Sequence, residues 1–138
     1  MKKITLIISI LCMSTYFLNA QNKNYHVVFD MTSKDTLNQQ SLLREMTLIK
    51  QGNPDAKLEA VIYGQGLSLI MKDVSVQSEA IRNLLSKKDV SFKVCEIAMK
   101  SHGVDKSQLL PGVETVPDGI YEIVLKQQQG WAYIKVAH

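Results

Sequence analysis

One cysteine, Cys95, combines a reactive side chain with a position that favours chemistry. It directly follows an apolar run at residues 90–94 and precedes a helical pattern at residues 96–101. A thiol where a strand gives way to a helix lies near unpaired backbone N–H groups, which favour the thiolate. We therefore expect an accessible, partly ionised nucleophile. The alternative is a small buried hydrophobe, because free cysteine is among the most buried residue types.

Two carboxylates, Asp30 and Glu96, are expected to lie beside this cysteine. Each stands at the end of a predicted strand, and ligands of open parallel sheets bind beyond the carboxyl ends of the strands. Asp30 is interpreted as a binding residue, with a capping or turn carboxylate as the alternative. Glu96 is expected to oppose activation of the thiol, because a nearby carboxylate disfavours a second negative charge. Residues 117–119 are expected at the same edge.

A glycine-rich turn, Gly64-Gln65-Gly66, follows the second predicted strand. Such a turn lets backbone N–H groups approach an anion, so all three residues are candidate binding residues. The turn is neither a Walker loop nor a GxGxxG sequence, and a plain tight turn is the alternative.

No metal site and no cofactor are predicted. His26 lies within a predicted strand and His102 precedes a glycine that ends a helix, so neither has ligand spacing with Cys95. HExxH, CxxC and GxSxG motifs do not occur in the sequence.

The elements that position these residues alternate along the chain. Short β-branched or aromatic runs predict strands at residues 25–31, 57–63, 90–94, 113–116 and 131–136. Helical spacing of apolar residues predicts helices around residues 42–50, 80–85, 96–101 and 118–129. This alternation predicts an α/β fold, a three-layer α/β/α sandwich with a mostly parallel sheet of about five strands.

The N-terminus has the pattern of a secretory signal peptide. Lys2 and Lys3 precede a mostly apolar run, and the small Ala20 ends it, which predicts cleavage after residue 20. The chain is thus divided into a signal at 1–20 and one domain at 21–138, with secreted or periplasmic localisation and no stable membrane insertion. Two of the 16 basic residues belong to the signal, so the remainder nearly balances the 13 acidic residues. We therefore expect no nucleic-acid partner.

The order of motifs resembles the DsrE/DsrF-like family over nearly all of the mature domain. The motifs are Asp30 at the end of a strand, Asn53-Pro54-Asp55-Ala56, Val61-Ile62-Tyr63-Gly64-Gln65-Gly66, Val90-Ser91-Phe92-Lys93-Val94-Cys95, Leu109-Leu110-Pro111-Gly112-Val113, Val116-Pro117-Asp118-Gly119 and Gln129-Gly130-Trp131-Ala132-Tyr133-Ile134-Lys135. The resemblance implies a parallel five-stranded sandwich that assembles as a trimer or hexamer. In sulfur-relay members a cysteine at the end of the third strand carries a persulfide, and Cys95 matches that position. Relay members work in the cytoplasm with partner subunits, whereas this chain is predicted to be exported.

Two functional hypotheses follow. In the first, an exported protein handles sulfur through a persulfide on Cys95, with Asp30, Gln65 and Glu96 around its pocket and a small sulfur compound or a protein thiol as partner. In the second, the chain is a non-enzymatic homo-oligomer that binds a small ligand or serves assembly. A thiol-disulfide oxidoreductase is disfavoured because the mature domain has no resolving cysteine.

Overall fold

Five parallel strands form one sheet in the order β4-β3-β2-β1-β5. The computed structural model describes residues 24–136, so the predicted signal at 1–20 lies outside the described residues. The strands are β1 (His26–Met31), β2 (Lys57–Ile62), β3 (Val90–Cys95), β4 (Glu114–Val116) and β5 (Ala132–Val136). The α-helices are α2 (Thr36–Gly52), α3 (Ser78–Leu85), α4 (Glu96–Ser101) and α5 (Gly119–Gln128), and the 3-10 helices are η1 (Gly64–Ile70) and η2 (Lys106–Gln108).

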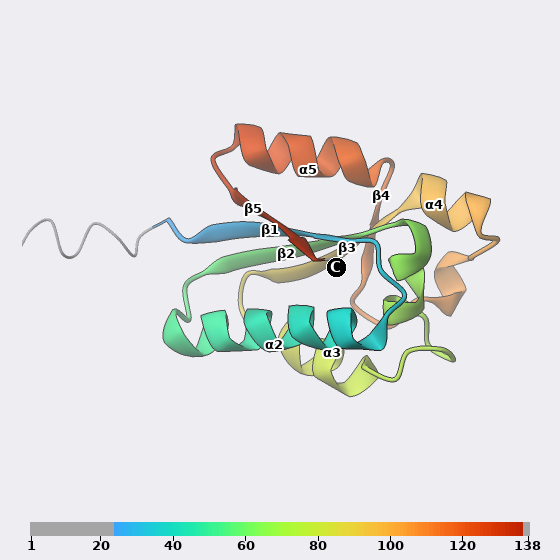
Figure 1. Cartoon of the computed structure of the whole chain (residues 1–138), viewed down its shortest axis with the longest axis horizontal. Coiled ribbons are helices and arrows are strands. Elements are labelled where there is room, and N and C mark those ends of the chain that lie inside the picture. Colours follow the sequence, from blue (N-terminus) through green and yellow to red (C-terminus); the bar gives the residue numbers. More distant parts are fainter. Residues whose placement is uncertain (1–23, 137–138) are drawn as a thin grey trace, which may run out of the picture.

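Helices cover both faces of the sheet, as predicted for a three-layer sandwich (Figure 1). α2 and α3 lie under one face, α5 lies over the other, and α4 follows β3 beyond the carboxyl edge. α5 connects β4 to β5, which are the two opposite edges of the sheet. This connection crosses from one edge of the sheet to the other, and α5 packs over β1, β2, β3 and β5.

The two faces are packed very differently. The face under α2 and α3 carries the main apolar core, with Phe29 and Leu58 from the strands buried against Leu42 and Met46 of α2. On the α5 face the buried apolar residues are Val28, Val61 and Ile123. The buried apolar layer under α5 is therefore the smaller of the two, although α5 lies close to β1, β2, β3 and β5.

Side-chain caps define where two of the helices begin. The carboxylate of Asp35 accepts a hydrogen bond from the backbone N–H of Leu37 at the start of α2. The carboxylate of Asp118 accepts one from the backbone N–H of Ile120 at the start of α5. Both aspartates precede an apolar periodic run, which is the pattern that predicts a helix start.

The glycine-rich segment after β2 begins a 3-10 helix, η1, rather than a simple turn. Gly64 has a φ of 57°, a conformation that favours glycine. The apolar residues that follow, Leu67, Leu69 and Ile70, are buried in the main core. The helical segment forms because these side chains must turn back under the sheet within a few residues.

None of the helices within residues 24–136 is long and apolar enough to cross a membrane.

Candidate functional site

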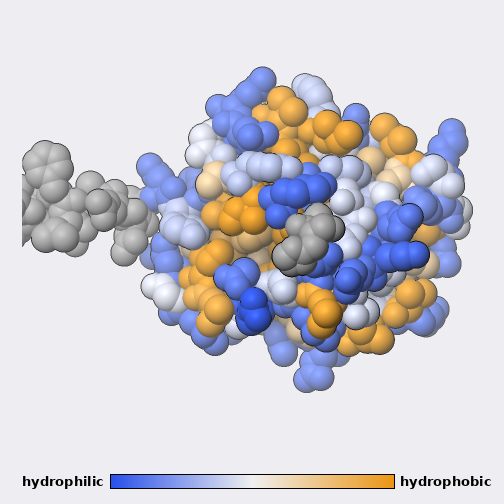
Figure 2. Space-filling model, viewed as in Figure 1, coloured by the Kyte–Doolittle hydropathy of each residue, from blue (hydrophilic) through white to orange (hydrophobic). Residues whose placement is uncertain are grey.

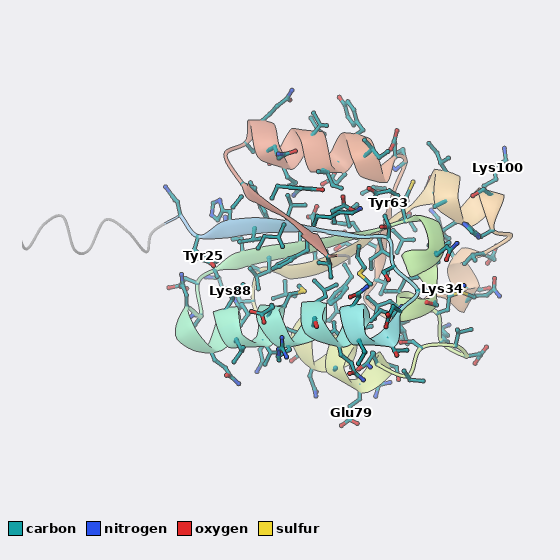
Figure 3. The ribbon with its side chains drawn as sticks, viewed as in Figure 1. Tyr25, Lys34, Tyr63, Glu79, Lys88 and Lys100 are labelled. Atoms are coloured by element: carbon teal, nitrogen blue, oxygen red, sulfur yellow. The ribbon has the colours of Figure 1, made fainter. Side chains whose placement is uncertain are left out.

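The strand ends bring most of the predicted site residues to one edge of the sheet. Asp30 lies in β1, Cys95 ends β3, and Glu96 opens α4. Tyr63, which follows β2, lies between the sheet and α5 at this edge (Figure 3). The site is therefore built from the carboxyl ends of three adjacent strands.

Asp30 is the centre of a charged cluster that also includes β5. Its carboxylate accepts a hydrogen bond from the Tyr133 hydroxyl at 2.7 Å and contacts Lys135 Nζ at 3.1 Å through both oxygens. Lys135 Nζ also lies 3.1 Å from the Thr32 hydroxyl. β1 and β5 pair so that Asp30 faces Lys135, which puts both side chains on the α5 face. The reading of Asp30 as a capping or turn carboxylate is wrong, because Asp35 caps α2 and Asp30 lies within the strand.

Tyr63 links this charged cluster to the thiol. Lys135 Nζ lies 5.7 Å from the centroid of the Tyr63 ring, within the range of a cation–π contact. Burial and the neighbouring Asp30 carboxylate raise the pKa of the Tyr63 phenol well above its ordinary value. The phenol is therefore a neutral hydrogen-bond donor at physiological pH.

Cys95 occupies the predicted position, but the expectation that it is accessible is wrong for this conformation. Its exposed fraction is 6%, and it borders the main core. The start of α5 covers it, because a methyl group added to Gly119 would lie 3.1 Å from Cβ of Cys95 and 3.5 Å from Cδ1 of Tyr63. The thiol is thus placed at the functional edge and sealed by the first turn of a helix.

Glu96 does not act as a free negative charge beside the thiol. Its carboxylate accepts a hydrogen bond from the Thr115 hydroxyl at 2.7 Å and forms an ion pair with Lys106 at 2.8 Å. Contact with Lys106 and Thr115 lowers the pKa of the Glu96 carboxyl, so it stays ionised but is balanced by a cation. Its expected opposition to thiolate formation is correspondingly reduced.

The three residues of the glycine-rich segment have different environments at the start of η1. Gly66 is buried against the end of β1, where an added methyl group would lie 2.7 Å from the carbonyl oxygen of Met31. Gly64 supplies the left-handed backbone conformation, and the Gln65 side chain is exposed. These residues start η1 and allow its close approach to β1.

Three residues of the cluster, Tyr63, Tyr133 and Lys135, are missing from the sequence-based set of site residues. Tyr133 and Lys135 alternate with Ala132, Ile134 and Val136 along β5, a period-two pattern that indicates one polar face. That pattern shows which face they share. It does not show that the face lies against Asp30, because the pairing of β5 with β1 is a property of the whole sheet.

A cavity at the other end of the sheet is not lined by Cys95. It has a volume of about 700 Å³ and is lined by the last turns of α2 and α3 and by the connections that follow them, including Lys50, Pro54 and Lys88. Pro54 and Lys88 precede β2 and β3, and Figure 3 shows Lys88 at the end of the sheet away from Tyr63. Within residues 24–136, no three His, Cys, Asp or Glu side chains are arranged to hold a metal ion.

The contact between Tyr133 and Asp30 predicts that the Tyr133 hydroxyl loses its proton only at unusually high pH. The hydrogen bond to the Asp30 carboxylate raises the pKa of Tyr133 from 10.0 to about 12. An acid whose pKa is raised by folding contributes stability below its unfolded value, and that contribution is lost as the pH rises through the folded value. We expect this contribution to disappear between pH 10.0 and about 12.

Asp30→Asn should lower the pKa of Tyr133, as measured by tyrosinate absorbance with Tyr133→Phe as the reference. An unchanged titration in Asp30→Asn would contradict this assignment.

Proteins of known structure share this fold over most of the chain. The model of the DsrE/DsrF-like family matches residues 17–136. MTH1491, a protein of unknown function from Methanobacterium thermoautotrophicum, is 29% identical with a TM-score of 0.76 over 81% of this chain and 99% of that chain. The ychN protein from E. coli is 12% identical with a TM-score of 0.69 over 81% and 98% of the two chains. BT1422, a conserved protein of unknown function from Bacteroides thetaiotaomicron, is 13% identical with a TM-score of 0.64 over 83% and 97%. No curated protein matches the chain.

Proposed function

Because the chain belongs to the DsrE/DsrF-like family, we propose that it handles sulfur through a persulfide on Cys95. The observation that carries this proposal is the position of Cys95 at the end of β3, directly before α4 and beside the Asp30 cluster. Cys95 is the free cysteine of the described residues, so it is the thiol available there for the reaction.

The proposed step transfers a sulfane sulfur without net oxidation. The Cys95 thiolate attacks the outer sulfur of a polysulfide or a persulfide donor, forming a new S–S bond at Cys95. The S–S bond of the donor breaks, and the donor leaves as a thiolate or a shorter polysulfide that takes the electron pair. Tyr63 lies beside Cys95 at the start of α5, so its neutral phenol is the candidate hydrogen-bond donor to the sulfur that becomes negative.

Mass spectrometry of the polysulfide-treated protein tests this proposal. We expect a mass increase in whole sulfur atoms on the peptide that contains Cys95, reversed by a reducing agent and lost in Cys95→Ala. Peptide-level detection separates Cys95 from Cys12, the other cysteine of the sequence. A protein that gains no sulfur at Cys95 after prolonged treatment would overturn the carrier role.

We also propose that the protein is exported and works as a homo-oligomer. Export rests on the signal pattern of residues 1–20. Assembly is supported by exposed apolar side chains on α5, namely Ile120, Tyr121 and Val124. Figure 2 shows apolar side chains gathered over this helix. Exposed apolar surface of this kind is typical of protein interfaces.

The second candidate function is a non-enzymatic binding or assembly module. The burial of Cys95 and the exposed apolar face of α5 favour it. In that case the thiol resists polysulfide and mild alkylation even when the protein is fully assembled. The same mass measurement therefore distinguishes the two functions.

A further inference from the structure

The outer side of β5 is an open edge of the sheet. Among the described residues, β5 pairs with β1 alone, and its residues from Ala132 to Lys135 are exposed. The opposite edge strand, β4, is shorter and has only three residues. An open edge presents unpaired backbone N–H and C=O groups, which favour the addition of another strand. β5 is therefore the edge at which an additional strand fits better.

β5 lacks the features by which edge strands usually avoid such pairing. Its sequence, AYIKV, contains no proline or glycine and is rich in residues that favour strands. Lysine is a common protecting residue at an edge, because its charge repels a neighbouring strand. Lys135, however, turns back onto the Asp30 carboxylate, with its Nζ 3.1 Å from both oxygens. Its charge is therefore balanced within the subunit.

Exposed apolar side chains accompany the open edge on the α2 side of the sheet. Ile134 is 42% exposed, and Tyr25, directly before β1, is 41% exposed. Together with Ile49 of α2 they line a cleft of about 360 Å³ between α2 and β5. Addition of a strand to β5 would cover this apolar surface and pair the backbone groups at the same time.

The side chains of β5 are complementary to those of a second copy. When two β5 strands run antiparallel about a two-fold axis between their Ile134 residues, Tyr133 lies opposite the partner's Lys135. On the other face Ala132 lies opposite the partner's Val136, and the two Ile134 side chains pack together. Cation–aromatic and apolar pairs of this kind stabilise neighbouring strands. A register centred on Lys135 would instead bring two ammonium groups together, so the charges favour the first register.

From these observations we propose that two copies of this chain pair through their β5 strands and join two five-stranded sheets into one. The partner's Tyr133 then lies beside Lys135, whose side chain is 43% exposed in the single subunit. The second copy thereby covers the open side of the Asp30 cluster. This interface adds a surface to the proposed homo-oligomer, and it requires neither the α5 surface nor a persulfide on Cys95.

Analytical ultracentrifugation of the purified protein tests the pairing through Ile134. Ile134→Lys places two cations opposite each other at the two-fold axis, so the mass of the assembly should fall to about half of the wild-type mass. This halving is expected whatever the α5 surface contributes, because each β5 contact joins two subunits. Val76→Lys adds the same charge at another exposed β-branched residue and should leave the mass unchanged. An unchanged mass in Ile134→Lys would overturn the inference.

A second variant of opposite charge distinguishes self-pairing from binding of another extended peptide. Ile134→Glu alone should also reduce the mass to about half, whereas an equimolar mixture of Ile134→Glu and Ile134→Lys should restore the wild-type mass. The mixture restores it because a carboxylate and an ammonium then face each other across the axis. A mixture that keeps the reduced mass would show that β5 does not face a second β5, and would overturn the inference.

Hydrogen exchange separates loss of the interface from general unfolding. In the wild-type protein, the β5 amides that point away from β1 should be protected from exchange. Ile134→Lys should remove this protection while the amides of β1 and β2 keep theirs. Equal loss of protection in the central strands would assign the smaller mass to unfolding and overturn the inference. None of these measurements involves a sulfur donor, so their outcome is independent of the sulfur function.

Discussion

Lys50→Met is expected to destabilise the protein by on the order of 3 kcal/mol, because it leaves three backbone carbonyl groups without their donor. The ammonium of Lys50, in α2, donates hydrogen bonds to the carbonyl oxygens of Pro54, Ala56 and Lys88. These carbonyls belong to the α2–β2 and α3–β3 connections. One buried side chain thus joins two loops that are far apart in the sequence.

Burial also lowers the pKa of Lys50, which shows that holding the charge there has a cost. Methionine keeps most of the side-chain volume and removes that cost, so the measured loss reports the unpaired carbonyls. Equilibrium unfolding in urea is the measurement, with exposed Lys87→Met from the same cavity wall as the matched control. We expect the control to change the free energy of unfolding by less than about 0.5 kcal/mol. Equal effects of the two substitutions would contradict the structural role of Lys50.

Gly66→Ala is expected to cost about 2–3 kcal/mol through a backbone clash. The added methyl group would lie 2.7 Å from the carbonyl oxygen of Met31, and that oxygen accepts the hydrogen bond from the Tyr63 N–H at 3.2 Å. Relief of the clash requires η1 to move away from the end of β1. Such a movement disturbs Tyr63, so the substitution should also change the environment of the candidate site.

Gly52→Ala is the matched control for this substitution. Gly52 ends α2, and an added methyl group there has no neighbour within 4 Å. Alanine is a better helix former than glycine, so the control should be neutral or slightly stabilising. Thermal melts of both variants measure the difference in stability between them. If Gly66→Ala and Gly52→Ala have the same melting temperature, the close approach of η1 to β1 does not constrain the fold.

The fold was predictable because its determinants are local. Apolar runs such as residues 90–94 and the helical spacing of Leu42, Leu43 and Met46 specify strands and helices within a few residues. Asp35 and Asp118 mark helix starts through hydrogen bonds to backbone groups two residues away. Strict alternation of strands and helices then restricts the sheet to a parallel arrangement with helices on both faces. The family match over residues 17–136 agrees with that prediction.

The candidate site was predictable only in part. The position of Cys95 and Asp30 at the carboxyl edge follows from the direction of parallel strands, which the alternation already fixes. Tyr133 and Lys135 could not be added from the sequence, because they reach Asp30 across 103 and 105 residues. Glu59 is a further case: a charged residue in an apolar strand is visible in the sequence, whereas its partner Lys126 is not.

The amino-acid sequence by itself determined the elements, their parallel arrangement and the strand end at which the thiol stands. Only the tertiary structure decided that β5 lies beside β1, that Lys135 meets Asp30, and that α5 closes over Cys95. The physical reason is the range of the interactions. The periodicity of apolar residues and helix capping involve residues that are close together in the sequence. Strand order, burial and ion pairing depend on how distant segments pack together.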